Sequence, residues 1–217
     1  MVLSVPSCLK LSVMNGVIKT FLFSSFILAQ YPADSLFSSP DNSIVQKLFL
    51  YPIAKWQSIS YNNNAMNCQF YPSCSNYGTH AIHEKGVISG LIMTSDRIIR
   101  CNPNAFGAHN RMGGKFHEDG RLIDHITYSD MSTTEKSPIL ASGLSMAVPG
   151  LGRAYAGRPQ DGLFGFFISA LAIRASVISV KNQSFFTPFY IGMAITFYGG
   201  EIYGAYRTAK YYQPPKG

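Results

Sequence analysis

Residues 68–103 read CQFYPSCSNYGTHAIHEKGVISGLIMTSDRIIRCNP, and this stretch decides the fold. Its first part predicts a helix over residues 76–85, because Gly86 suits the left-handed conformation that commonly ends a helix. A second helix is predicted over residues 87–100, and Pro103 prevents it from continuing. The stretch therefore predicts a compact helical hairpin.

Cysteines stand at both ends of this hairpin. Cys68 and Cys74 precede the first helix, for which Ser73 or Ser75 can act as the N-cap, and Cys101 closes the second helix. A hairpin of this size buries too little apolar surface to be stable alone. We therefore expect a cross-link, a metal ion or membrane contact to stabilise it.

The second helix has two kinds of side chain that matter for function. Arg97 and Arg100 are predicted to project away from the apolar face and to contact lipid headgroups or acidic groups of a partner. The side chains expected to face inward are Ile88, Leu91, Ile92, Ser95, Ile98 and Ile99.

The cysteines leave several chemical interpretations open. A disulfide, from Cys68 to Cys74 or from Cys74 to Cys101, is favoured if the chain is exported, and three free thiols are the alternative. A zinc site completed by His80 or His83 is less favoured, because intervals of five and 26 residues are not the tight spacing of most zinc modules. Nucleophilic catalysis by a cysteine–histidine pair would need an acid or amide to orient the histidine, and the hairpin has none at a recognisable spacing. The sequence therefore predicts no enzyme, catalytic residue, metal or cofactor.

The composition indicates a membrane protein. Hydrophobic residues make up 47% of the chain and charged residues only 13%, which is too apolar for an ordinary soluble domain. Of the net charge of +7, residues 138–217 carry +5, although they are the most apolar third. Such charge is typical of topology signals beside membrane spans and does not indicate a nucleic-acid surface.

Residues 1–29 are predicted to be a signal peptide or N-terminal leader. Lys19 precedes the apolar run of residues 21–29, and the polar segment that follows suits cleavage after Ala29. Nine apolar residues are too few to cross a core of about 30 Å.

An amphipathic helix is predicted over residues 44–60. We expect it to lie against a membrane or a partner, with packing into a small core as the alternative, and Pro52 to kink it or to end its first part. The apolar side chains on or near one face are Ile44, Val45, Leu48, Phe49, Ile53 and Trp56.

Two membrane spans are predicted at residues 162–180 and 185–206, preceded by a polar linker over residues 104–137. Arg174 and Glu201 lie toward the ends of these spans, where their side chains can reach the membrane surface. The fold class is therefore all-α, a small cysteine-containing hairpin module with two or three transmembrane helices.

The third span, residues 139–155, is broken by glycine and proline and either crosses or re-enters the membrane. Most of the basic residues that flank the spans, among them Arg158 and Lys210, lie on one side of the membrane. The excess of positive charge predicts that this side is the cytoplasm. A crossing segment would place the hairpin outside, and a re-entrant one would keep it in the cytoplasm.

The hairpin resembles the YidD-type membrane protein insertion efficiency factors. That family opens on C-[RQ]-[FY]-x-P-[ST]-C-S-x-Y, has a helix ended by Gly and closes on R-[IL]-x-R-C-x-P. The family usually has His after the last cysteine, where this chain has Asn102. The matching residues are Cys68, Phe70, Pro72, Ser73, Cys74, Ser75, Tyr77, Ala81, Ile82, Gly86, Gly90, Arg97, Ile98, Arg100, Cys101 and Pro103.

The resemblance covers residues 44–103 and implies a non-enzymatic accessory factor at the bacterial inner membrane. Its expected partners are the phospholipid membrane, the membrane protein insertase and the translocon, and not nucleic acid. Two other functions are consistent with the residues: an exported envelope module closed by a disulfide, and a membrane-perturbing, lytic-type protein.

Overall fold

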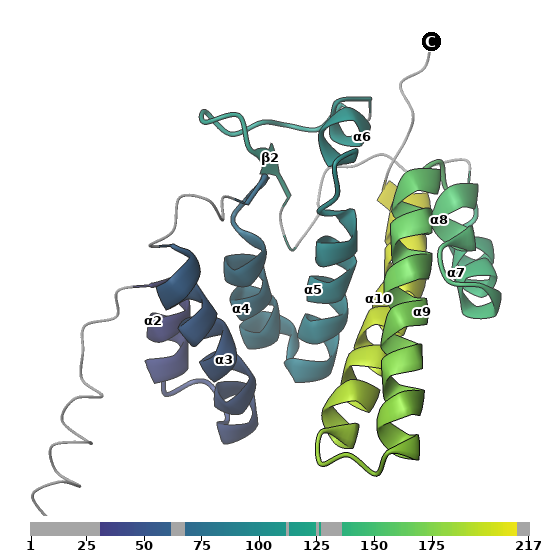
Figure 1. The fold of residues 1–217 in the computed structure, drawn as a ribbon. Helices are drawn as coiled ribbons and strands as arrows, with labels where there is room; N and C mark the ends of the chain where they lie inside the picture. Colours follow the sequence, from purple (N-terminus) through teal and green to yellow (C-terminus); the bar gives the residue numbers. More distant parts are fainter. Residues whose placement is uncertain (1–30, 62–67, 112, 125, 127–135, 212–217) are drawn as a thin grey trace, which may run out of the picture.

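The computed structural model describes residues 31–61, 68–111, 113–124, 126 and 136–211. These residues are mostly helical with very little strand, as predicted, and the helices run roughly side by side (Figure 1). In chain order the elements are α2 (Pro32–Ser38), α3 (Ile44–Ser60), β1 (Phe70–Tyr71), α4 (Cys74–Lys85), α5 (Val87–Arg100), α6 (Ala105–Arg111), β2 (Leu122–Ile123), α7 (Pro138–Ala147), α8 (Leu151–Tyr155), α9 (Pro159–Lys181) and α10 (Thr187–Tyr211). The predicted leader lies outside the described residues.

The predicted helical hairpin is confirmed as α4 and α5. Ser73 is the N-cap of α4, and its hydroxyl accepts a hydrogen bond from the backbone N–H of Asn76 at 3.3 Å. Gly86, at φ 77°, joins the two helices in a conformation that an L side chain rarely adopts. At Gly90 a Cβ would lie 2.6 Å from the backbone of Ile82, so glycine lets the two helices approach closely.

The predicted inner face of α5 is wrong in part. Ile88 is 77% exposed and Ile98 is 42% exposed, whereas Arg97 and Arg100 are buried. The reason is that α10 packs along α5 through small residues, and Gly199 and the neighbouring Gly200 and Gly204 lie against Ile92, Ser95 and Asp96. The C-terminal helices therefore cover the polar side of α5.

Part of the predicted linker packs onto the hairpin. Strand β2 pairs in parallel with β1, with Phe70 opposite Leu122, and both side chains are buried with Ala105 from α6. This pairing fixes the position of Asp124, which follows β2 and is 2% exposed.

Helix α3 continues through Pro52 as one helix, and the side chains that it buries are Leu50, Ala54, Gln57 and Ser60. The side-chain oxygen of Gln57 accepts a hydrogen bond from the backbone N–H of Ala33 at 2.9 Å, and Gln46 donates to the carbonyl of Ile82 at 3.0 Å. The alternative prediction, that the apolar face of this helix packs into a small core, is therefore wrong for most of its side chains. The exposed side chains on α3 include Ile44 at 88%, Val45 at 58%, Leu48 at 70%, Phe49 at 37%, Trp56 at 51% and Ile59 at 59%.

The C-terminal part consists of two long helices and two short ones. Among the described helices, α9 alone is long and apolar enough to cross a membrane. Helix α10 has 25 residues, but it also carries Glu201 and Arg207 and is not apolar enough to qualify. By length and composition, the described helices therefore support fewer membrane spans than predicted. Helix α7, with ten residues, is about 15 Å long, half of the membrane core, and Gly150 at φ 87° separates it from α8.

Candidate functional site

Two aspartates and two arginines form a closed ring of ion pairs between α5, the segment after β2, and α10. Arg100 contacts Asp96 at 3.1 Å and Asp124 at 2.8 Å. Arg207 contacts the same two carboxylates, at 2.9 and 2.7 Å. All four side chains are at most 2% exposed. We call these four residues the ion-pair ring.

Two further arginines attach to this ring. Arg153 of α8 contacts the second oxygen of Asp96 at 2.7 Å and reaches Glu201 of α10 at 2.8 Å. Arg97 donates to the backbone carbonyl of Asp124 at 2.6 Å, and its guanidinium lies over the ring of Tyr77. Because buried charges are costly unless paired, this arrangement requires every one of these segments in place at once.

The arginines determine the charge state of the two aspartates. Burial alone would raise the pKa of Asp96, but the charges of Arg100, Arg153 and Arg207 hold it well below its usual range. Burial would also raise the pKa of Asp124, but the charges of Arg100 and Arg207 outweigh it and lower this pKa to about 2. Both carboxylates are therefore ionised at neutral pH.

This geometry corrects the predicted role of Arg97 and Arg100. Their side chains are 0% and 1% exposed and meet carboxylate and carbonyl groups of the same chain, so they do not present charge to lipid headgroups. Glu201 is likewise 0% exposed and pairs with Arg153, so the prediction that it reaches the membrane surface is wrong. Arg174 is exposed on α9.

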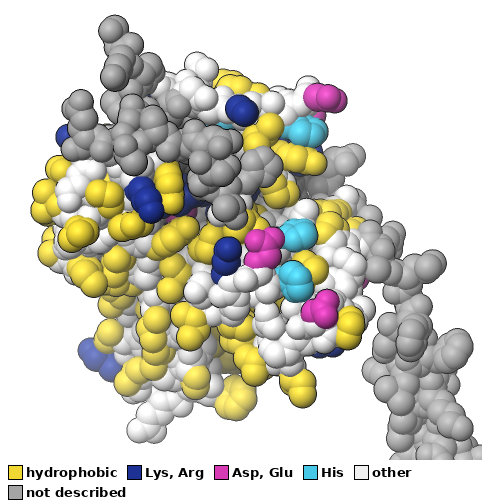
Figure 2. Space-filling view, turned by 180° about the vertical axis from the view of Figure 1, so that it is seen from behind, with side chains coloured by type: hydrophobic (Ala, Val, Ile, Leu, Met, Phe, Trp, Pro, Cys, Tyr) yellow, Lys and Arg dark blue, Asp and Glu magenta, His cyan; other side chains and the backbone are white. Residues whose placement is uncertain are grey.

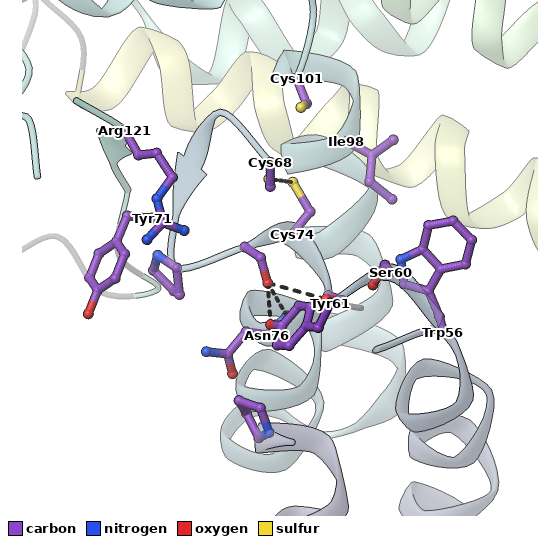
Figure 3. Close-up of a pocket in the computed structure, with 14 residues that line it drawn as sticks. Trp56, Ser60, Tyr61, Cys68, Tyr71, Cys74, Asn76, Ile98, Cys101 and Arg121 are labelled. Atoms are coloured by element: carbon purple, nitrogen blue, oxygen red, sulfur yellow. Dashed lines mark hydrogen bonds between the residues drawn. The ribbon is translucent and has the colours of Figure 1, made fainter. Parts of the chain in front are cut away.

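The three cysteines meet at an open cleft of about 710 Å³ (Figure 3). Their sulfur atoms lie within 4.8 Å of one another, and those of Cys68 and Cys74 are 3.6 Å apart. All three are free thiols in this structure. The predicted zinc partners are not beside them: His83 contacts Asn42 at 2.7 Å, and among the described residues no histidine joins the group.

The surroundings of the cysteines are partly apolar and partly cationic. Hydrogen bonding with Cys101 and Cys74 lowers the pKa of Cys68, whereas hydrogen bonding with Cys101 and Cys68 raises the pKa of Cys74. The side-chain amide of Gln69 donates to the sulfur of Cys101 at 3.4 Å. The cleft is also lined by Trp56, Tyr61, Tyr71, Pro72, Ser73, Ser75, Ile98 and Arg121.

The other predicted motif residues have mainly structural surroundings. Phe70 and Tyr77 are buried and lie under the guanidinium of Arg97, at 4.9 and 4.4 Å. Burial raises the pKa of Tyr77 to about 12. Ser75 accepts a hydrogen bond from Gln57 at 3.4 Å. Gly86 and Pro103 stand at the ends of helices.

Sequence reasoning missed the carboxylates and two of the arginines. Asp96 and Asp124 lie 28 positions apart, and no spacing links them to Arg153 or Arg207. Asn102 was noted only as a departure from the family pattern, yet it is buried and donates to Asp161 of α9 at 2.7 Å. The available signal was Asp96 beside Arg97 and Arg100 in one helix, because charged side chains that are buried need partners.

Comparison with known proteins identifies the first part of the chain. Residues 45–112 match the family model YidD, described as "Putative membrane protein insertion efficiency factor". A relative of that name from Colwellia psychrerythraea is 44% identical over 63 residues, which is 29% of this chain and 77% of the relative. Another from Legionella pneumophila is 35% identical over 69 residues, 32% of this chain and 85% of the relative.

A third relative, from Oleidesulfovibrio alaskensis, is 29% identical over 79 residues, 36% of this chain and 92% of the relative. No solved structure matches the chain. The chain therefore belongs to the YidD family of membrane protein insertion efficiency factors. None of these names refers to an exported envelope module or to a lytic protein.

The family match and the ion-pair ring do not coincide. Asp96 and Arg100 lie inside the matched residues, whereas Asp124 and Arg207 lie beyond them. Helices α7 to α10 also lie outside the match. The ring is thus the place where the family domain and the additional C-terminal helices are joined.

Proposed function

We propose that this chain is a non-enzymatic accessory that assists the insertion of proteins into the bacterial cell membrane, close to the insertase and the translocon. The family supports this role through the name that its members carry. The observation in the structure that carries the proposal is the outward face of α3. On this face Ile44, Leu48 and Ile59 are 88%, 70% and 59% exposed, while the opposite side of the helix buries Leu50, Ala54 and Gln57.

Such a face is costly in water and suits the interfacial zone of a bilayer. Helix α9 adds a second lipid-facing surface, because Leu163, Phe167 and Leu171 are each more than half exposed. Seen from behind, hydrophobic side chains gather over the half of the molecule that the C-terminal helices form (Figure 2). In this proposal α9 anchors the chain and α3 lies at the membrane surface, where a nascent span can meet it.

The membrane contact of α3 can be tested directly, because Trp56 is the single tryptophan of the chain and is 51% exposed on this helix. The full chain is reconstituted into vesicles whose lipids carry bromine along the acyl chains. We expect the brominated lipids to quench Trp56 emission strongly. Quenching by aqueous acrylamide alone would overturn the membrane contact.

The accessory role needs a separate measurement of insertion. The yield of a small test membrane protein is compared in vesicles holding the insertase with and without this chain. We expect the double variant Leu48→Gln, Ile59→Gln to lose most of the stimulation, because it makes the α3 face polar. The control Glu84→Gln, an exposed change on α4, should retain it. Equal yields with and without the wild-type chain would refute the role.

A further inference from the structure

Cys68, Cys74 and Cys101 come from three different segments of the family domain and converge on one point. Cys68 precedes β1, Cys74 is the first residue of α4, and Cys101 is the C-cap of α5. Their sulfur atoms all lie within 4.8 Å of one another, although up to 33 positions separate them in the chain. Three sulfurs held together by three backbone segments form a potential ligand set, whereas a single helix end or a single cysteine does not.

The distances between the sulfur atoms suit three ligands around one metal ion better than a disulfide bond between two of them. A Zn–S bond of about 2.3 Å places three sulfurs around a single ion roughly 3.8 Å apart. Here the sulfurs of Cys68 and Cys74 are 3.6 Å apart and all three lie within 4.8 Å of one another, so shifts of about 1 Å or less would complete the arrangement. A disulfide needs a separation of about 2.05 Å and would engage only two of the three.

The groups around the cysteines support a bound ion with several thiolates. Gln69 donates to the sulfur of Cys101 at 3.4 Å and to the carbonyl of Asn102 at 3.2 Å, which orients one ligand from outside. Arg121 lines the same cleft, where its guanidinium is paired with Asp119 at 2.7 Å. Phe70, Ala105 and Leu122 pack against the cysteines from the protein side.

The other side of the cysteines is open. The cleft of about 710 Å³ begins at their sulfur atoms, with Tyr71 and Trp56 among its walls (Figure 3). Among the described residues, no further cysteine, histidine or carboxylate lies in the group. A fourth position on the ion would therefore be available to water or to a small thiol, as in zinc sites with three protein ligands.

We propose that Cys68, Cys74 and Cys101 form a three-sulfur binding site for a soft d¹⁰ cation, Zn²⁺ or Cu⁺, whose open position faces the cleft. Binding replaces the thiol protons, which pass to the solvent, and neither the sulfurs nor the ion changes oxidation state. The ion ties the entry to β1, the start of α4 and the end of α5 together.

The test uses the full chain, reduced and kept under anaerobic conditions in detergent. Zn²⁺ and Cu⁺ are titrated separately against chromophoric chelators specific for each, and Co²⁺ is added as a spectroscopic probe. We expect one Zn²⁺ or one Cu⁺ per chain, an S→Co²⁺ charge-transfer band, and a higher unfolding temperature when the ion is bound.

Matched variants locate the site. Cys74→Ser and Cys101→Ser should each weaken binding at least tenfold, whereas Cys8→Ser, at the fourth cysteine, should leave it unchanged. Far-UV circular dichroism of each metal-free variant establishes that it is folded, and the Co²⁺ band of the unaltered chain is independent of any variant. Absence of stoichiometric binding to the unaltered reduced chain overturns the proposal. Binding that survives in both variants, or a Cys68–Cys74 disulfide in chain alkylated directly in cells, overturns it as well.

Discussion

Arg153 of α8 donates a hydrogen bond to Asp96 of α5 at 2.7 Å, across 57 positions of the chain, and both side chains are 0% exposed. One residue belongs to the family domain and the other to the additional C-terminal helices. One buried carboxylate, which also contacts Arg100 and Arg207, therefore connects the two parts directly.

Asp96→Asn should be among the most damaging single changes in the chain. It removes the charge that three buried arginines share, and the loss of one partner from a buried ion pair costs about 3–5 kcal/mol. We expect a markedly lower unfolding midpoint in detergent. The control Asp119→Asn, at a 43% exposed side chain, should leave the midpoint unchanged. Equal midpoints for the two variants would contradict the importance of the ion-pair ring.

Acid should destabilise the chain through the same two aspartates. The pKa of Asp124 falls from its ordinary value of 3.8 to about 2 on folding, and that of Asp96 is also lowered. A group with a lowered folded pKa stabilises the fold fully above its unfolded pKa, and this contribution is lost as the pH falls through the folded value. Stability should therefore drop as the pH falls from about 4 toward 2.

This pH dependence is measured by following unfolding at a series of pH values. Asp124→Asn should flatten the curve in that window, because the substituted residue no longer titrates. A curve of unchanged slope in the variant would show that other groups cause the acid sensitivity.

Gly204→Ala tests the close approach of α10 to the ion-pair ring. A Cβ at this position would overlap the guanidinium of Arg153 and the carboxylate of Asp96. Overpacking of this kind costs about 1–3 kcal/mol, so the unfolding midpoint should fall. Gly192→Ala on the same helix is the matched control, since nothing lies within 4 Å of its Cβ and alanine favours the helix. An unchanged unfolding midpoint in the Gly204→Ala variant would mean that α10 does not pack as closely against the ion-pair ring.

The side of the membrane on which the cysteines lie follows from the short α7. We expect the family domain to stay on the cytoplasmic side with Arg158, because ten residues do not cross the bilayer. An impermeant thiol reagent should then label Cys68, Cys74 and Cys101 in permeabilised cells only, in a chain carrying Cys8→Ser. Asn182→Cys, between α9 and α10, should be labelled in intact cells. Labelling of the native cysteines in intact cells would place the family domain outside.

The sequence predicted the local structure of the family domain well. Ser73, Gly86 and Pro103 are signals of helix ends that depend only on neighbouring backbone groups, and the hairpin follows from them. The apolar face of α3 was also visible, because helical periodicity places its members together. Its outward direction was not, since periodicity defines a face without saying what covers it.

The sequence by itself thus determined the helices α3, α4, α5, α9 and α10, the cysteine-containing hairpin and the resemblance to the family. Only the tertiary structure decided that Arg97 and Arg100 are buried, because their shared partner Asp124 comes from a segment with no fixed spacing to them. Likewise, the convergence of Cys68, Cys74 and Cys101 depends on the packing of β1, α4 and α5. Pairing of distant charges and sulfurs is a property of how elements pack, and no local rule encodes it.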